Sequence, residues 1–326
     1  MRAMVMAAGL GTRLRPLTYE VPKPMVPVAN RPVMELLLRL LADQGFAQVV
    51  ANLHWFPETI ESRFGDGSEL GIELTYIHEP ELTGTAGGVR AAREFLTGEP
   101  GPFMVLAGDA LTDIDLRELA EAHRRHGGIA TLAAKPVPNV SEYGVIVIDG
   151  DARVQGFQEK PDPSEALSDL ANCMIYVFEP EVFDYFPDDD PLDFALDVFP
   201  ALLSHDVPFH VHSTGAYWND VGSLPEYLRG NLDVVGGEVD VNPAGRLLED
   251  AEGALGTEVE ASGRILIGDG VEIGAGARLD GPLVIGDGST IGEGARVRES
   301  VLLPGAAIGD EALVAGAIVG RRGALA

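Results

Sequence analysis

Short apolar runs alternate with amphipathic segments along roughly the first 230 residues. We expect strands at 3–7, 48–52, 73–77, 103–107, 129–134, 144–148 and 174–178. We expect helices near 32–44, 57–65, 86–96, 115–126, 193–204 and 224–232. This alternation predicts an α/β fold with a mixed, mostly parallel sheet covered on both faces. Ligands of such sheets bind beyond the carboxyl ends of the strands, so we expect the site there.

The C-terminal region has a different period. Aliphatic residues recur every six positions at Ile267, Ile273, Leu279, Ile285, Ile291, Val297 and Leu303. Glycine follows four of the first five, as Gly268, Gly274, Gly286 and Gly292. This period is typical of a hexapeptide β-helix, in which the aliphatic residue points inward and glycine helps to turn the corner. A flexible glycine-rich tail would not explain such regular spacing.

The repeat sets the expected domain organisation. After Leu303 the frame slips, and Ile308 and Val314 continue it, which predicts about three and a half triangular coils between about residues 257 and 320. A chain of 326 residues suits two domains. We therefore expect an α/β domain over 1–235, a poorly patterned linker over 236–256 and a short left-handed parallel β-helix over 257–326.

The net charge of −28 argues against a nucleic acid or an anionic membrane as partner, because both require basic patches. No apolar run approaches the roughly 20 residues of a membrane span. Met1 leads directly into the first strand, so no signal peptide is expected. The single cysteine, Cys173, suits a reducing compartment. These observations predict a cytoplasmic protein.

Lysine is scarce in this sequence. Among 23 basic residues only Lys23, Lys135 and Lys160 are lysines. Their survival reflects either composition bias or a need for a compact point charge. Lys135 is expected to be a solvated residue at a strand end.

A glycine-rich segment, Gly9-Leu10-Gly11-Thr12-Arg13, follows the first strand. Such a turn lets backbone N–H groups approach a phosphate. A dinucleotide fingerprint would need glycine where Leu14 stands, and the Gly-Lys-Ser/Thr of a Walker loop is also lacking. Prolines on both sides of Lys23 restrict its backbone. An ordinary Gly/Pro loop is the alternative.

Gly-Leu-Gly-Thr-Arg-Leu-Arg-Pro-Leu-Thr followed by Pro-Lys-Pro-Met-Val-Pro-Val resembles the signature of sugar-1-phosphate nucleotidyltransferases. The resemblance implies a Rossmann-like nucleotidyltransferase domain with an NTP and a sugar 1-phosphate as substrates. It implies that Arg13 grips the triphosphate and that Lys23 stabilises charge at the reacting phosphate. The remaining nucleotide contacts that it implies in this loop are Ala8, Gly9, Gly11 and Thr12.

Two aspartates are candidate ligands for Mg²⁺. Asp109 follows Gly108 at the end of an expected strand, where a helix cap or turn is the alternative role. Asp220 lies in Tyr-Trp-Asn-Asp-Val-Gly. The resemblance assigns both as metal ligands. Mg²⁺ commonly takes one or two carboxylates together with substrate phosphates, so this pair is chemically sufficient.

Three further segments resemble the sugar-binding motifs of the family. In Gly-Phe-Gln-Glu-Lys-Pro, Lys160 would bind the sugar phosphate and Glu159 would accept hydrogen bonds from sugar hydroxyls. The backbone of Gly144 and the side chain of Asn172 would face the sugar. After Asn172 the family usually has small residues, often glycine, whereas this chain has Cys173-Met174. We therefore expect the sugar pocket to differ in shape from that of the family.

The segment from Glu79 to Gly88, with Gly84 and Thr85, corresponds to the base-reading loop of the family. An ionised carboxylate offers two acceptors, which match the N1–H and exocyclic amine of guanine. This favours GTP, and Gly-Thr-Ala-Gly resembles the mannose-1-phosphate guanylyltransferase branch. In the alternative interpretation Glu79 is a surface residue and backbone groups alone read the base. Glucose-1-phosphate thymidylyl or uridylyl transfer remains the alternative reaction.

Functions of other classes are less well supported. A non-catalytic regulatory paralogue would tend to lose ligands, but Arg13, Lys23, Asp109, Lys160 and Asp220 are all present. Acyl transfer by the coil would need a histidine base, and the sequence has no histidine after His212. We therefore expect the coil to serve assembly of a homo-oligomer or regulation.

Overall fold

The computed structural model describes residues 1–188, 191–255 and 258–325. The chain forms two compact units. The first contains residues 1–10, 37–110 and 114–218, and the second contains residues 11–36, 111–113 and 219–326. The expected boundary between linker and coil, at 256–257, lies outside the described residues, as does the last residue of the expected coil domain, Ala326.

The first unit is built on a mixed sheet that has nine strands within the described residues. These strands are β1 (Ala3–Met6), β4 (Gln48–Leu53), β5 (Glu73–His78), β6 (Phe103–Ala107), β8 (Ala130–Pro136), β9 (Gly144–Ile148), β10 (Val154–Glu159), β11 (Leu170–Phe178) and β12 (Phe209–Ser213). Their main order is β10-β9-β11-β6-β1-β4-β5, and β8 joins β12 to β11. Strands β6, β1, β4 and β5 are parallel, whereas β11 is antiparallel to its neighbours. The predicted mixed α/β sheet is confirmed.

Burial explains the sequence pattern of these strands. All five residues of β6 are buried, which suits its continuous apolar sequence, because helices cover both faces of a central strand. At the edge, β5 alternates between exposed Glu73 and Thr75 and buried Leu74. Two strands of this sheet were not predicted, β10 and β12. The sequence of β10 mixes polar residues with Gly156, whereas Phe209-His210-Val211-His212 has a period of two that could have revealed β12.

The helices lie close to their expected positions. They are α1 (Val33–Asp43), α2 (Pro57–Phe64), α3 (Thr85–Ala91), α4 (Arg93–Leu96), α5 (Leu116–His126), α6 (Phe199–Ser204) and α7 (Leu224–Gly236). Asp115 caps α5 as its side chain accepts from the N–H groups of Arg117 and Glu118. The helix expected at 86–96 is broken at Ala92 into α3 and α4. The helix expected at 193–204 begins as a π-helix over Phe194–Val198.

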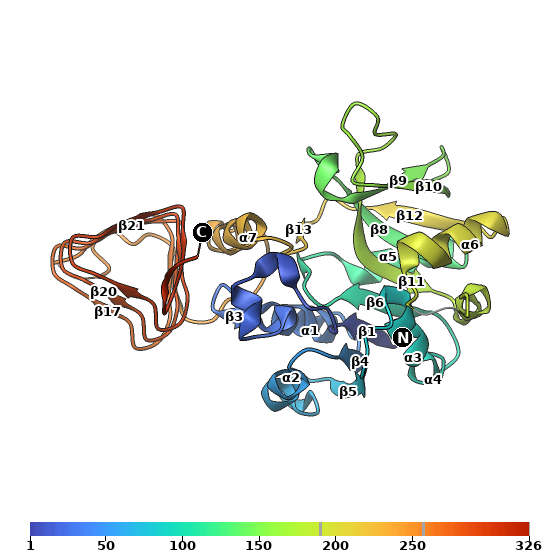
Figure 1. Cartoon of the computed structure of the whole chain (residues 1–326), viewed down its shortest axis with the longest axis horizontal. Helices are drawn as coiled ribbons and strands as arrows, with labels where there is room; N and C mark the ends of the chain where they lie inside the picture. The colour runs from blue at the N-terminus through green and yellow to red at the C-terminus, as the bar shows by residue number, and fades with distance from the viewer. Residues whose placement is uncertain (189–190, 256–257, 326) are drawn as a thin grey trace. The chain divides into compact units, whose positions relative to one another are not determined.

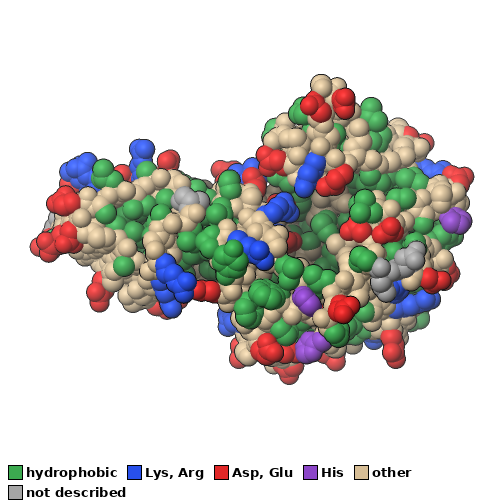
Figure 2. Space-filling model, viewed as in Figure 1, with side chains coloured by type: hydrophobic (Ala, Val, Ile, Leu, Met, Phe, Trp, Pro, Cys, Tyr) green, Lys and Arg blue, Asp and Glu red, His purple; other side chains and the backbone are tan. Residues whose placement is uncertain are grey.

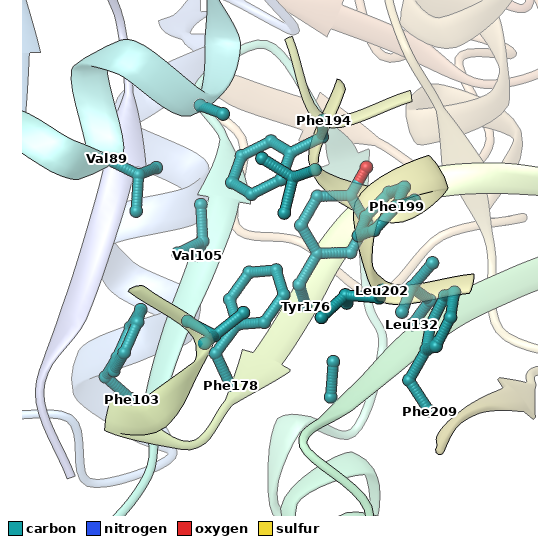
Figure 3. Close-up of a cluster of buried hydrophobic side chains, with 14 of the residues drawn as sticks. Val89, Phe103, Val105, Leu132, Tyr176, Phe178, Phe194, Phe199, Leu202 and Phe209 are labelled. Carbon is teal, nitrogen blue, oxygen red and sulfur yellow. The ribbon is translucent and has the colours of Figure 1, made fainter. Parts of the chain in front are cut away.

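Several aromatic side chains contact one another in the core of the first unit (Figure 3). Phe178 and Phe194 stack with ring centroids 5.4 Å apart, and Phe199 stacks on Phe209 at 5.8 Å. Tyr176 meets Phe199 edge to face at 5.4 Å. Offset and edge-to-face pairs of this kind stabilise a core beyond the area they bury. They join β11 and β12 to the 194–204 helical segment.

The C-terminal part of the second unit is a parallel β-helix, seen as stacked triangular turns in orange and red in Figure 1. One face stacks β15 (Glu260–Ser262), β18 (Arg278–Asp280), β21 (Arg296–Arg298) and β24 (Leu313–Ala315). Another stacks β16 (Ile265–Ile267), β19 (Leu283–Ile285), β22 (Val301–Leu302) and β25 (Ile318–Gly320) between antiparallel β14 (Arg246–Leu248) and β26 (Gly323–Ala324). The third stacks β17 (Glu272–Ile273), β20 (Thr290–Ile291) and β23 (Ala307–Ile308). The predicted parallel coil is confirmed.

The glycines of the repeat are needed for space. A Cβ on Gly274 would lie 2.6 Å from the nitrogen of Glu293, and one on Gly286 would lie 2.5 Å from the nitrogen of Pro304. Both contacts are with the backbone of the next turn, which a side chain cannot displace. Close stacking of turns therefore explains these glycines.

The frame slip comes earlier than predicted. Ile285 pairs with Ile267 in the preceding turn and with Leu302 in the next. Leu302 is fully buried, whereas Leu303 is half-buried. The expectation that Leu303 continues the inward stack is wrong, because the repeat shortens by one residue before it.

The second unit also contains residues that precede most of the first unit in sequence. Strands β2 (Pro27–Val28) and β3 (Arg31–Pro32) pair with each other, and α7 packs against β2, β19 and β22. The amide of Asn30 donates to the carbonyl oxygen of Ile285 at 3.0 Å. The remaining strands of the described residues, β7 (Leu111–Thr112) and β13 (Trp218–Asn219), pair with each other.

Acidic side chains spread over the visible face of the molecule, with basic ones between them (Figure 2). This distribution accords with a solvated acidic surface. In the described part of the chain, none of the helices is both long enough and apolar enough to span a membrane.

Candidate active site

Gly11, where the second unit begins, turns the glycine-rich loop sharply with a φ of +61°. A Cβ there would lie 2.9 Å from Cβ of Lys23 and from Cγ2 of Thr18. The hydroxyl of Thr18 donates to the carbonyl oxygen of Gly11 at 2.7 Å. Glycine is therefore required both by the left-handed backbone and by the close packing of Lys23.

Lys23 lies beneath this loop and is only 8% exposed. Its ammonium group donates to the main-chain oxygen of Asp220 at 3.1 Å. The guanidinium of Arg13 lies 3.9 Å from the Asp220 carboxylate, and its side chain is 60% exposed. The second unit thus brings together Arg13, Lys23 and Asp220, which are far apart in sequence.

The Asp220 carboxylate is held by a tight turn. Its Oδ1 accepts from the N–H of Gly222 at 3.1 Å, and a Cβ on Gly222 would overlap Oδ2. Val221 has a φ of +42°, and its N–H donates to the Asn219 side chain at 2.7 Å. The order Asn-Asp-Val-Gly therefore fixes the direction of the carboxylate.

In the first unit, Ala8, Gly9 and Asp109 follow the carboxyl ends of parallel strands β1 and β6. The N–H of Gly108 donates to the carbonyl oxygen of Met6 at 2.8 Å, and a Cβ on Gly108 would lie 2.7 Å from that oxygen. Gly108 thus allows the chain to turn beside β1, which places Asp109 at the strand edge where ligands of such sheets bind.

Glu79 directly follows β5 and is only 6% exposed, so the alternative that it is a surface residue is wrong. Its carboxylate accepts from the amide of Asn52 at 2.5 Å and from the hydroxyl and N–H of Thr83 at 2.8 and 3.1 Å. Gly84 has a φ of +87°, and a Cβ there would overlap the carbonyl oxygen of Leu192. The hydroxyl of Thr85 donates to Asp193 at 2.8 Å.

The expected sugar-binding residues lie on β9, β10 and β11 of the first unit. Glu159 pairs with Gly144, and a Cβ on Gly144 would lie 2.9 Å from the Glu159 carboxylate. The ammonium of Lys160 lies 3.7 Å from that carboxylate. The backbone N–H of Lys160 donates to the carbonyl oxygen of Tyr143. Both side chains are largely solvent-accessible, so they are open to a ligand.

Asn172 precedes an irregularity in β11. Its Oδ1 accepts from the N–H of Met174 at 3.0 Å, and its Nδ2 donates to the Tyr176 hydroxyl at 2.9 Å. Met174 has a φ of +53°. Glycine adopts this conformation most easily, which explains why the family often has glycine where this chain has Cys173-Met174. Burial raises the pKa of the Cys173 thiol.

Sequence reasoning missed several residues that support these segments. Asn52 and Asp193 hold the 79–85 loop, and Trp218 donates from its indole to the carbonyl oxygen of Cys173 at 3.1 Å. Lys135 is half-buried, donates to the carbonyl oxygen of Ala216 at 2.6 Å and lies over the Tyr217 ring. The expectation that Lys135 is solvated is therefore wrong.

The family of the chain follows from its sequence as a whole. Residues 2–236 match the nucleotidyl transferase family model, and residues 261–325 match the GMPPB C-terminal domain model. The chain belongs to the nucleotidyl transferase family. The residues assembled above therefore lie in a nucleotidyl transferase domain.

Two curated relatives show the range of this family. A UTP–glucose-1-phosphate uridylyltransferase of Synechocystis is 42% identical over 73% of this chain and 64% of that protein. The mannose-1-phosphate guanylyltransferase catalytic subunit beta of Drosophila pseudoobscura is 36% identical over 70% of this chain and 61% of that protein. The match thus spans less than two thirds of either relative.

A solved structure has a similar fold. HddC from Yersinia pseudotuberculosis, complexed with GMP-PN, is 26% identical with a TM-score of 0.61, and the match covers 71% of this chain and 97% of that chain. Most of this chain thus shares its fold with a solved structure.

Proposed function

We propose that this chain transfers a nucleotidyl group from an NTP to a sugar 1-phosphate, releasing pyrophosphate. The observation that carries the proposal is the grouping of Arg13, Lys23 and Asp220 around the glycine-rich loop, in a protein whose net charge is −28. Such a protein repels phosphates in general, so a few placed cations have to provide the attraction. The family membership supports the same reaction class.

The reaction needs positioning and charge neutralisation. An oxygen of the sugar 1-phosphate attacks the α-phosphorus of the NTP, and the bond to pyrophosphate breaks as the new bond forms. The attacking oxygen is already anionic, so no general base is required. Lys23, held by its bond to Asp220, stabilises the charge of the reacting phosphate, and Arg13 binds the triphosphate.

Mg²⁺ is the proposed metal, with Asp109 and Asp220 as its protein ligands. Within the described residues no group of three or more His, Cys, Asp or Glu side chains could hold a metal. A magnesium ion bound by one or two carboxylates and completed by substrate phosphates needs no such group, so these residues fit it. When bound, the ion would supply positive charge to the phosphates.

The remaining contacts divide between the two substrates. The nucleotide would be lined by Ala8, Gly9, Gly11 and Thr12. The loop from Glu79 to Thr85 would lie beside its nucleobase. Gly144, Glu159, Lys160 and Asn172 would bind the sugar phosphate. The cytoplasmic location, the homo-oligomer and the division into domains stay predictions.

We favour GTP and mannose 1-phosphate as substrates. The Drosophila relative carries that activity in its name, the coil matches the GMPPB C-terminal domain, and HddC was crystallised with GMP-PN. The runner-up is UTP with glucose 1-phosphate, which the name of the Synechocystis relative supports at higher identity.

A substrate matrix tests both levels of the proposal. Four NTPs are combined with mannose and glucose 1-phosphates in the presence of Mg²⁺, and pyrophosphate release is measured. Release from one pairing supports transfer and identifies the substrates. Absence of release from every pairing would favour a non-catalytic regulatory paralogue.

A further inference from the structure

Asn52, at the carboxyl end of β4, connects two segments of the proposed nucleotide site. Its Oδ1 accepts from the N–H of Ala7 at 2.9 Å, and its Nδ2 donates to the Glu79 carboxylate at 2.5 Å. Asn52 is 4% exposed. Because a backbone N–H can only donate, the amide oxygen must face Ala7, and the NH₂ group must then face Glu79.

The Glu79 carboxylate is in turn bound at both oxygens. Oε1 accepts from Asn52, while Oε2 accepts from the hydroxyl and the N–H of Thr83. Thr83 lies at the far end of the turn that Glu79 begins. The carboxylate therefore closes this turn and ties it to β4.

Helix α3 covers the pair from one side. A Cβ on Gly88 would lie 2.7 Å from Oε1 of Glu79 and would overlap Nδ2 of Asn52. This crowding restricts the approach of another group to Oε1. To accept from both N1–H and the amine of guanine, the carboxylate would have to release Asn52 and Thr83. The buried NH₂ of Asn52 and the half-buried donors of Thr83 would then be unpaired.

We propose that Asn52 and Glu79 are positioning residues, which hold the 79–84 loop in place through hydrogen bonds, and that the Glu79 carboxylate does not read the base. The loop then recognises the base through groups other than this carboxylate. The inference rests on the proposed function, because it assigns the loop to the nucleotide.

Exchange of the two side-chain types tests the proposal. In Glu79→Gln the new amide can satisfy either Asn52 or Thr83 but not both, since Ala7 fixes the orientation of Asn52. In Asn52→Asp the introduced carboxylate faces the Glu79 carboxylate, and neither can donate a hydrogen bond to the other. In the double variant, the carboxylate introduced at position 52 accepts from Ala7 and from the NH₂ of the amide introduced at position 79, and the oxygen of that amide accepts from Thr83. The double variant thus restores every hydrogen bond, with the polarity between positions 52 and 79 reversed.

The expected kinetics follow from this geometry. Loss of a buried hydrogen bond to a charged group should raise KM for every NTP about tenfold in each single variant. The ratio of kcat/KM for GTP and UTP should stay within about threefold, and the double variant should recover KM to within about threefold. Glu69→Gln is the matched control, because it removes the same charge from an exposed position outside the proposed nucleotide site and should leave KM unchanged.

A base-reading carboxylate would give another result. Glu79→Gln would then change the ratio between GTP and UTP by far more than threefold, and Asn52→Asp would not restore it. That outcome would overturn the proposal.

Hydrogen exchange of the substrate-free chain separates this inference from the proposed function. The amides of residues 79–84 should exchange faster in each single variant and return to the wild-type rate in the double variant. If wild type releases no pyrophosphate with any NTP, the proposed function fails. Return of the exchange rate to the wild-type value in the double variant would still support the positioning role of Asn52 and Glu79. Unchanged hydrogen exchange in the single variants would overturn the proposal that Asn52 and Glu79 position the loop, even if the enzyme is active.

Discussion

The ammonium group of Lys23 donates to the main-chain oxygen of Asp220 at 3.1 Å. The bond sets the direction of the lysine side chain. It also fixes a nearly buried cation beside a carboxylate that we propose as a metal ligand. Position and charge are thus set before any substrate binds, which is the arrangement that electrostatic catalysis requires.

Replacement of Lys23 by methionine should lower kcat by about 10²- to 10³-fold, as expected for a central electrostatic group. The apolar stem keeps its packing against Gly11, so the fold should persist. Pyrophosphate release measures the loss, and urea unfolding verifies the fold. Arg124→Gln, which removes an exposed charge on α5, is the control. A folded Lys23→Met protein with nearly normal turnover would remove Lys23 from this role.

Asp109→Asn and Asp220→Asn should each lower turnover about 10²-fold or more and raise the Mg²⁺ concentration needed for half-maximal rate. The amide oxygen that Asp220→Asn introduces can still accept from the N–H of Gly222, so the local turn should be kept. A Mg²⁺ titration of pyrophosphate release measures both effects. Asp151→Asn, in an exposed turn, should behave as wild type. If Asp109→Asn retains nearly normal dependence on Mg²⁺, its assignment as a ligand is wrong.

Lys160→Ala should mainly raise KM for the sugar 1-phosphate. Lys160 is half exposed and near Glu159, so loss of its charge should change the fold little. Initial rates at saturating NTP separate KM from kcat. Lys160→Arg keeps the charge and should retain more of the affinity. An unchanged KM in Lys160→Ala would exclude Lys160 from the phosphate site.

Patterns that repeat along the chain predicted much of the fold. The coil was predictable because each inward residue, such as Ile285, packs on its equivalents in neighbouring turns. The shift from Leu303 to Leu302 was not predictable, because one missing residue can be absorbed at several positions of a turn. Strand β6 was found from its continuous apolar sequence, whereas β10 carries the polar residues of the proposed sugar site.

The candidate site was predictable where its motifs are continuous in sequence, as around Arg13 and Lys23. Its supports were not, because they depend on contacts between distant residues. Asn52 gains its meaning from Ala7 and Glu79, which lie 45 and 27 residues away. From the sequence we expected the Glu79 carboxylate to accept hydrogen bonds from guanine. In the structure both of its oxygens already accept hydrogen bonds from Asn52 and Thr83.

Gly84→Ala should destabilise the protein far more than Gly101→Ala. Both glycines have a positive φ, of +87° and +107°, so both substitutions strain the backbone by about 1–3 kcal/mol. Only at Gly84 would the added Cβ overlap backbone, the carbonyl oxygen of Leu192, whereas none of the described atoms lies within 4 Å at Gly101. The overlap should add about 1–3 kcal/mol, measured by urea unfolding. Equal losses of unfolding free energy in Gly84→Ala and Gly101→Ala would mean that the backbone near Gly84 shifts to accommodate the Cβ without a loss of stability.

Removal of the coil should weaken the unit that holds the phosphate loop. A chain ending at Gly237 loses the carbonyl oxygen of Ile285, to which Asn30 donates, and loses β19 and β22, against which α7 packs. We expect a lower urea midpoint together with reduced activity, so the shortened chain would be a poor test of assembly alone. The point variant Asn30→Ala should cost about 1 kcal/mol.

Leu313→Ser is the control for this experiment, because Leu313 is 76% exposed on the coil and its replacement should change stability by less than about 0.5 kcal/mol. A shortened chain that keeps the wild-type midpoint and turnover would contradict the structural role of the coil. If that chain also became monomeric, the coil would serve assembly instead. The two roles are therefore separated by stability and by mass, measured on the same protein.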